Sequence, residues 1–99
     1  MSDESQITVP PSFVALFIPE GRIKPTETKE VIAQRYELCE DFAQMLVDRA
    51  QTRQWELGMT EGDVLQRIGA GLEGSEVFGP AERAWVMTRL AELLGWGVQ

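Results

Sequence analysis

The chain has 99 residues and a net charge of −7, with 43% hydrophobic and 25% charged residues. This length and composition predict one folded domain, residues 10–99, behind a flexible polar tail of residues 1–9. The acidic balance argues against phosphate backbones and anionic lipid surfaces, so we expect no nucleic acid and no membrane among the partners.

Residues 12–18, SFVALFI, form a short and strongly apolar segment that follows two prolines. Ser12 is suited to cap a helix, so the segment predicts a short N-terminal helix. A tight turn is predicted over residues 18–21, because Pro stands at its second position and Gly at its fourth.

This apolar segment has two interpretations. It either closes the core as a plug or stays exposed as a hook for a partner protein, because a monomer rarely exposes such a patch without a binding role. Burying its large side chains would stabilise a small domain strongly, so the plug is the preferred interpretation. As a hook, its candidate partner contacts are Phe13, Leu16 and Phe17.

Residues 26–53 have the periodicity of one long amphipathic helix, with Thr26 placed to cap it and no Gly or Pro inside it. Apolar residues recur at steps of four and three, which predicts a buried row. This row consists of Ile32, Tyr36, Cys39, Ala43, Leu46 and Ala50. Other apolar residues predict a wider stripe on one side of the row, namely Val31, Leu38, Phe42 and Met45. We expect residues 13–18 to fold back over this wider side.

The pattern after residue 53 predicts a second helix. The long helix is expected to continue through Trp55 and to stop at Gly58. The second helix then begins with Thr60 as its cap. Its predicted buried residues are Val64, Leu65, Ile68 and Leu72. Three glycines are expected to end it within a few residues, namely Gly69, Gly71 and Gly74.

The last helix is predicted to begin at Gly79-Pro80, since Pro suits a first turn, and to stop at Gly95. Trp96 falls where a Schellman ending places an apolar contact, over Ala91 or Leu90. Together these elements predict an all-α fold, a small helical bundle of three main helices plus a short N-terminal helix. Short connections favour antiparallel neighbours.

Motifs that would mark an active site are missing from the sequence. There is no His, Cys39 is the only Cys and lies in the predicted buried row, and no glycine is followed by Lys as a phosphate loop requires. Residues 69–74 match GxGxxG, but a dinucleotide site needs a strand before this motif and a helix immediately after it. We therefore assign no catalytic, cofactor-binding or metal-ligating residue, and no cofactor.

Two further features carry functional hypotheses. Glu37, Glu40 and Asp41 cluster on the long helix, where they form a solvated acidic face or, alternatively, hold a hard cation or act as acid–base groups. Trp55 has charged neighbours near a helix end, so we expect it to be partly exposed. We add Trp55 to the candidate partner contacts.

The sequence also bears on location. The N-terminal residues MSDESQ have neither the basic region nor the apolar core of a signal peptide, and no apolar run reaches the length of a membrane span. A lone Cys cannot form an internal disulfide. These features predict a cytoplasmic protein.

The chain resembles a family of small proteobacterial proteins of about this length. The resemblance rests on three stretches and their spacing, VPPSFVALFIPEGRIKP, RYELCEDFAQ and RLAELLGW, and covers nearly the whole chain. Members of the family have no established function and are sometimes labelled "ATPase with chaperone activity". The resemblance therefore implies a chaperone-like role and an ATPase activity, and it assigns no site residue.

Two classes of function follow from these observations. The first is a non-enzymatic protein-binding or adaptor protein, chaperone-like as the resemblance implies, and the absence of His and of a phosphate loop favours it. The alternative is an enzyme that uses carboxylates such as Glu37 and Asp41, or a nucleotide-binding protein. That alternative requires a concave site that contains a carboxylate with a shifted pKa.

Overall fold

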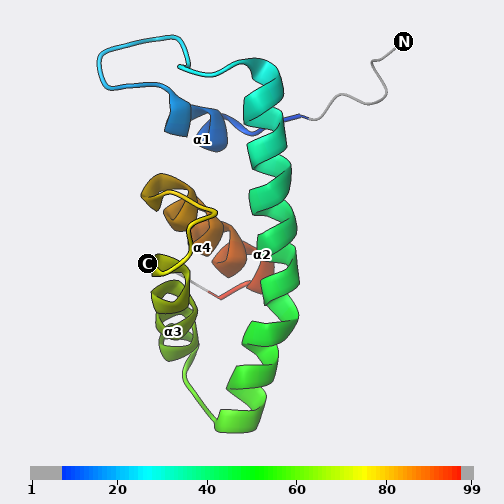
Figure 1. Ribbon diagram of the computed structural model, residues 1–99. Helices are drawn as coiled ribbons and strands as arrows, with labels where there is room; N and C mark the ends of the chain where they lie inside the picture. The colour runs from blue at the N-terminus through cyan, green and yellow to red at the C-terminus, as the bar shows by residue number, and fades with distance from the viewer. Residues whose placement is uncertain (1–7, 97–99) are drawn as a thin grey trace. The chain divides into compact units, whose positions relative to one another are not determined.

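The computed structural model describes residues 8–96, and within that range the regular secondary structure is all helical, with no strand (Figure 1). The elements are α1 (Pro11–Val14), the 3₁₀ helix η2 (Ala15–Phe17), α2 (Lys29–Leu57), α3 (Glu61–Glu73) and α4 (Pro80–Leu94). The predicted all-α fold, with three main helices and a short N-terminal one, is confirmed. Most of the predicted flexible tail, residues 1–7, lies outside the described residues.

The chain forms two compact units, Met1–Leu38 and Cys39–Gln99, which we call unit 1 and unit 2. The boundary lies within α2, so this helix contributes residues to both units. None of the helices described in residues 8–96 combines the length and the apolar character that crossing a bilayer requires.

Unit 1 is built around Phe13 of α1, whose side chain is fully buried. The Phe13 ring lies 5.5 Å from the Phe17 ring and 5.7 Å from the Tyr36 ring of α2, which it meets edge-on. Aromatic pairs at such distances add to the free energy gained by burial alone. The predicted cap is wrong, because Pro10 occupies the N-cap position and Ser12 lies inside α1. Pro at N1 already has the helical φ and lacks an N–H that would need a partner.

The loop after η2 is shaped by one turn and one threonine. The N–H of Arg22 donates to the carbonyl of Pro19 at 3.0 Å, and Gly21 has φ of 81° at the third position of the turn. This is a type II arrangement, one residue later than predicted, because only Gly adopts that φ without strain. Thr26 then donates to the Phe17 carbonyl from both its N–H, at 2.8 Å, and its hydroxyl, at 3.2 Å.

This use of Thr26 explains why the predicted start of the long helix is wrong. Thr28 is the residue that caps α2, accepting a hydrogen bond from the N–H of Val31 at 3.2 Å. The predicted end is confirmed, because α2 runs through Trp55 to Leu57 and stops at Gly58.

The buried row of α2 is confirmed, with Ile32, Cys39, Ala43, Leu46 and Ala50 all buried and Tyr36 half-buried. The prediction that the apolar stripe widens on one side of this row is wrong in large part. Three of its four additional residues are exposed, Val31 by 36%, Leu38 by 40% and Met45 by 53%. At 3.6 residues per turn these positions lie about 100° or more around the helix from the centre of the row. Their side chains therefore point away from the residues that pack against the buried row. The fourth member, Phe42, is half-buried, and its ring lies 5.2 Å from that of Phe78.

Helix α3 begins as predicted, with the Thr60 hydroxyl accepting from the N–H of Asp63 at 3.1 Å. Its buried face consists of Val64, Ile68 and Leu72, while Leu65 is half-buried. Of the three glycines predicted to end it, Gly74 is the C-cap, whereas Gly69 and Gly71 lie inside α3. Each internal glycine costs about 1 kcal/mol, which the burial of this face offsets. The GxGxxG match is therefore a helix and its end.

Both predicted ends of α4 are confirmed. Gly79 is the N-cap, and its N–H donates to the Glu82 carboxylate at 3.3 Å. Gly95 ends the helix with φ of 71°. The N–H of Trp96 donates a hydrogen bond to the Ala91 carbonyl at 3.1 Å, and the N–H of Gly95 donates one to the Glu92 carbonyl at 3.1 Å. These two bonds make the predicted Schellman ending, and Trp96 is buried.

Within unit 2, α4 is joined to α2 by a bidentate ion pair. Arg89 donates to the two Glu40 carboxylate oxygens, from Nε at 2.8 Å and from Nη2 at 3.0 Å, and also from Nη1 to Glu92 at 3.3 Å. The hydrogen bond from Arg89 lowers the pKa of the Glu40 carboxyl, and partial burial opposes this effect only in part. The same hydrogen bond raises the pKa of the Arg89 guanidinium.

The Glu40–Arg89 pair predicts a pH dependence of stability. Because the folded pKa of Glu40 lies below that of an unfolded glutamate, about 4.3, the pair stabilises the fold fully above that pH. This contribution is lost as the pH falls through the folded pKa. We expect Glu40→Gln to lower the free energy of unfolding at pH 7 and to flatten its decline between about pH 5 and 3.

Urea unfolding across this pH range checks the prediction. A hydrogen bond to a charged group contributes about 1.5–3 kcal/mol, and the part exposure of Arg89 reduces that contribution. The control is Glu37→Gln, which alters an exposed carboxyl on the same helix. An equal decline with falling pH in Glu40→Gln and wild type would contradict the assignment.

Candidate binding groove between α3 and α4

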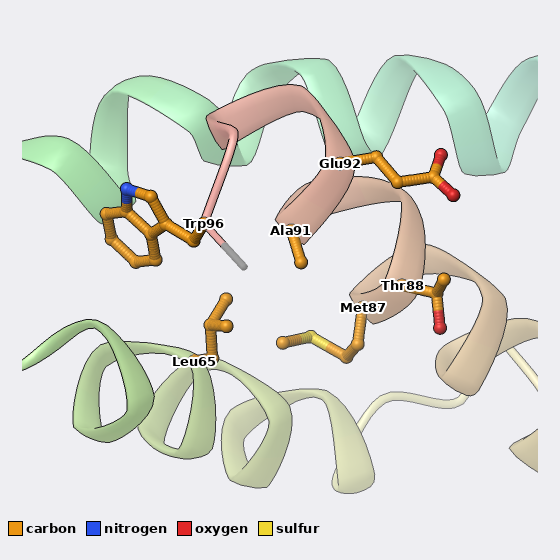
Figure 2. Close-up of a pocket in the computed structure, with 6 residues that line it drawn as sticks. All are labelled: Leu65, Met87, Thr88, Ala91, Glu92 and Trp96. Atoms are coloured by element: carbon orange, nitrogen blue, oxygen red, sulfur yellow. The ribbon is translucent and has the colours of Figure 1, made fainter. Parts of the chain in front are cut away.

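An apolar groove of about 470 Å³ lies between α3 and α4 in unit 2. Figure 2 shows Leu65 of α3 and Met87 and Ala91 of α4 pointing into the same space. Trp96 closes one end of this space, and Thr88 and Glu92 lie toward the other end with the Glu92 carboxylate turned outward. The groove is therefore apolar inside and polar at its edge, as binding sites for side chains commonly are.

The local structure of α4 explains why these residues meet. Residues four positions apart lie on the same side of a helix. Two adjacent rows on one face of α4 therefore line the groove, one formed by Met87 and Ala91 and the other by Thr88 and Glu92. Trp96 joins them because the Schellman ending folds the chain back over Ala91. On α3, Leu65 comes from the edge of the apolar face rather than from its buried centre.

The groove has a neighbour farther along the same helix pair. A second depression of about 350 Å³ is bordered by Gly69, Glu73, Arg83 and Ala84 among others, and Met87 borders both depressions. Met87 lies beside Gly69, where an added Cβ would lie 3.9 Å from the Met87 side chain. Small residues on both sides of Met87 leave room along the seam for another chain.

Two carboxylates and one guanidinium, that of Arg83, border this seam. Glu92 borders the groove and Glu73 borders the second depression. The arginines of α4 are engaged within unit 2, because Arg83 donates to the Phe78 carbonyl at 3.0 Å and Arg89 pairs with Glu40. Residues 54–76 contain five carboxylates and one arginine. This stretch, which includes all of α3, is therefore acidic and would attract a basic partner.

The residues predicted as partner contacts lie in different units. Phe13 is fully buried, and Leu16 and Phe17 are half-buried in the same apolar segment of unit 1. Trp55, near the end of α2 in unit 2, is 87% exposed. Three of the four thus belong to unit 1 and one to unit 2. Their role in partner binding stays a prediction.

The groove could not be predicted from the sequence. Leu65, Met87 and Ala91 belong to apolar faces, and periodicity does not distinguish a face that is filled by neighbours from one that is left partly open. The one usable signal was Trp96, whose contact with the end of α4 was predicted from the Gly95 ending.

The carboxylates of the predicted acidic cluster lie elsewhere. Glu37 and Asp41 are exposed, and neither borders the groove or the depression beside it. Glu40 is bound to Arg89, which lowers its pKa, whereas a general acid working near neutral pH needs a raised pKa. Within residues 8–96, no three His, Cys, Asp or Glu side chains are grouped so that they could hold a metal ion.

The chain matches no protein-family model, no curated protein and no solved structure. The groove, the charges around it and the exposed residues of unit 2 are therefore the features that bear on function.

Proposed function

We propose that this chain is a cytoplasmic, non-enzymatic protein-binding protein that holds the apolar face of a partner helix in the groove between α3 and α4. The observation that carries the proposal is the open apolar space around Leu65, Met87 and Trp96. An amphipathic helix placed in such a groove buries residues spaced three and four apart along one face. The role is that of an adaptor or a chaperone-like protein.

The charge distribution supports a basic partner. Carboxylates border both depressions along the seam, Arg89 is paired with Glu40, and Arg83 donates to the Phe78 carbonyl. A helix with leucines on one face and lysines flanking them complements this surface, because opposite charges speed encounter and exclude acidic competitors. The resemblance to the small proteobacterial family supports the chaperone-like part of the proposal.

The proposal is tested with a synthetic partner. The probe is an 18-residue peptide of leucine and lysine whose leucines share one helical face. Its control has the same composition but no apolar face. Binding is followed by the fluorescence of Trp96 in a protein that carries Trp55→Phe and Trp85→Phe. We expect the amphipathic peptide to change the Trp96 emission and to bind at least tenfold more tightly than the scrambled peptide.

Two matched variants locate the binding site. Thr88→Arg puts a cation in the groove, where it should weaken binding of the amphipathic peptide at least tenfold. Thr52→Arg changes the net charge equally at an exposed position of α2, and both threonines have a glutamate four residues later. We expect a change below twofold for Thr52→Arg. Equal weakening by both variants, or equal binding of both peptides, would show that only net charge attracts the probe.

A further inference from the structure

Three arginines of unit 2 converge on one small cavity in a protein whose net charge is strongly negative. Arg49 and Arg53 are one turn apart on α2, and Arg67 comes from α3. All three side chains are exposed, and they border a cavity of about 240 Å³ between the two helices. No carboxylate is among the residues that line this cavity.

These guanidinium groups have no counter-ion in the described part of the chain. Within residues 8–96, none of the three arginines forms an ion pair or a side-chain hydrogen bond. Asp48 and Glu56 border a separate depression on α2 that also includes Arg49 and Arg53, and they do not pair with them either. Because the guanidinium fork matches a carboxylate or a phosphate, three of them at one cavity form a site for an anionic group.

The inner surface of the same cavity is apolar. Leu46 of α2 and Ile68 and Leu72 of α3 line the cavity and are buried, whereas the arginines are exposed, and Phe42 completes the lining on the α2 side. Gly71 also lines the cavity, and a Cβ there would meet no atom within 4 Å. A ligand that enters would therefore meet cations at the mouth and hydrocarbon below.

The volume restricts the size of that ligand. Pockets for drug-sized molecules usually measure about 300–1,000 Å³, so this cavity fits a smaller molecule. We propose that it binds a small organic anion, with one carboxylate or phosphate group on a short apolar body. The anionic group is held by the three arginines, and the apolar body lies against Leu46, Ile68 and Leu72. This proposal does not depend on the groove between α3 and α4.

Isothermal titration in 150 mM NaCl tests the proposal with simple probes. Octanoate and octyl phosphate, below their micelle concentrations, carry both required features. Acetate lacks the apolar body, and octylammonium lacks the anion. We expect octanoate or octyl phosphate to bind at least tenfold more tightly than acetate and octylammonium, and the tighter of the two identifies the preferred anionic group. Equal binding of octanoate and acetate, or of octanoate and octylammonium, would overturn the proposal.

Variants separate the contribution of the arginine charges to binding from that of the apolar part of the cavity. Arg53→Gln and Arg67→Gln should each weaken binding of the tighter probe at least fivefold. The control Arg22→Gln removes an exposed arginine of unit 1 and should change binding less than twofold. Gly71→Leu keeps all three arginines but fills the apolar part, and leucine is a better helix former than glycine. We expect it to weaken binding at least fivefold without lowering the melting temperature.

Two outcomes would count against the site. If Arg22→Gln weakens binding as much as Arg67→Gln, general charge and not the cavity attracts the anion. If Gly71→Leu, with its melting temperature maintained, binds like wild type, the apolar part of the cavity is not occupied. Either result would overturn the proposal.

Discussion

Replacing Phe13 with alanine should lower the free energy of unfolding by about 3–5 kcal/mol, the usual cost of removing a buried phenylalanine side chain. The side chain is fully buried between the Phe17 and Tyr36 rings, so the variant loses both aromatic contacts and leaves a cavity. That cost is a large part of the net stability of a small domain, about 5–15 kcal/mol. Urea unfolding followed by circular dichroism measures it.

The matched control for this prediction is Phe17→Ala. Phe17 is half-buried and touches Phe13 on one side, so its removal should cost less than half as much. Truncations extend the test, since removing residues 2–9 should leave unfolding almost unchanged while removing residues 2–18 should destabilise the fold sharply. If the longer truncation unfolds like the full chain, the apolar segment is a hook for a partner and not a plug.

The second large effect is expected for Leu90→Ala in α4. Leu90 is fully buried, so the substitution should cost about 2–5 kcal/mol. For a domain of this size that corresponds to a fall in melting temperature of roughly 10–30 °C. Differential scanning calorimetry provides the measurement.

Leu57→Ala is the control for Leu90→Ala, because Leu57 is 59% exposed near the end of α2. An exposed substitution of this kind usually changes stability by about 0.5 kcal/mol or less. Similar melting temperatures for the two variants would mean that α4 is not packed in unit 2 as the structure has it.

The helical character of the main segments and most helix ends were predictable from the sequence, because they depend on local chemistry. Thr60, the Gly79-Pro80 pair and Gly95 each act on backbone groups within a few residues, so their roles can be recognised in the sequence. The start of α2 was not predictable in this way. Thr26 and Thr28 are both suitable caps, and the choice between them follows from the bonds of Thr26 to the Phe17 carbonyl, nine residues away.

The candidate sites were less predictable for a different reason. The groove depends on a gap between Leu65 and Trp96, and the arginine cavity depends on α3 bringing Arg67 beside Arg49 and Arg53. Both are distances between helices, and periodicity gives only the faces of each helix. Exposure of Met45 illustrates the same limit, because an apolar residue at the edge of a stripe is buried only if a neighbour reaches it.

The Glu40–Arg89 pair has a consequence during synthesis. Its two residues are 49 positions apart, and Arg89 lies in α4, which is synthesised after α2 and α3. At the usual rate of about 5–20 residues per second, α2 waits roughly 2–10 s for α4. During this interval Glu40 lacks its arginine partner and unit 2 is incomplete, so the nascent chain passes through a state in which the apolar row from Cys39 to Ala50 is not yet fully packed and is open to other proteins.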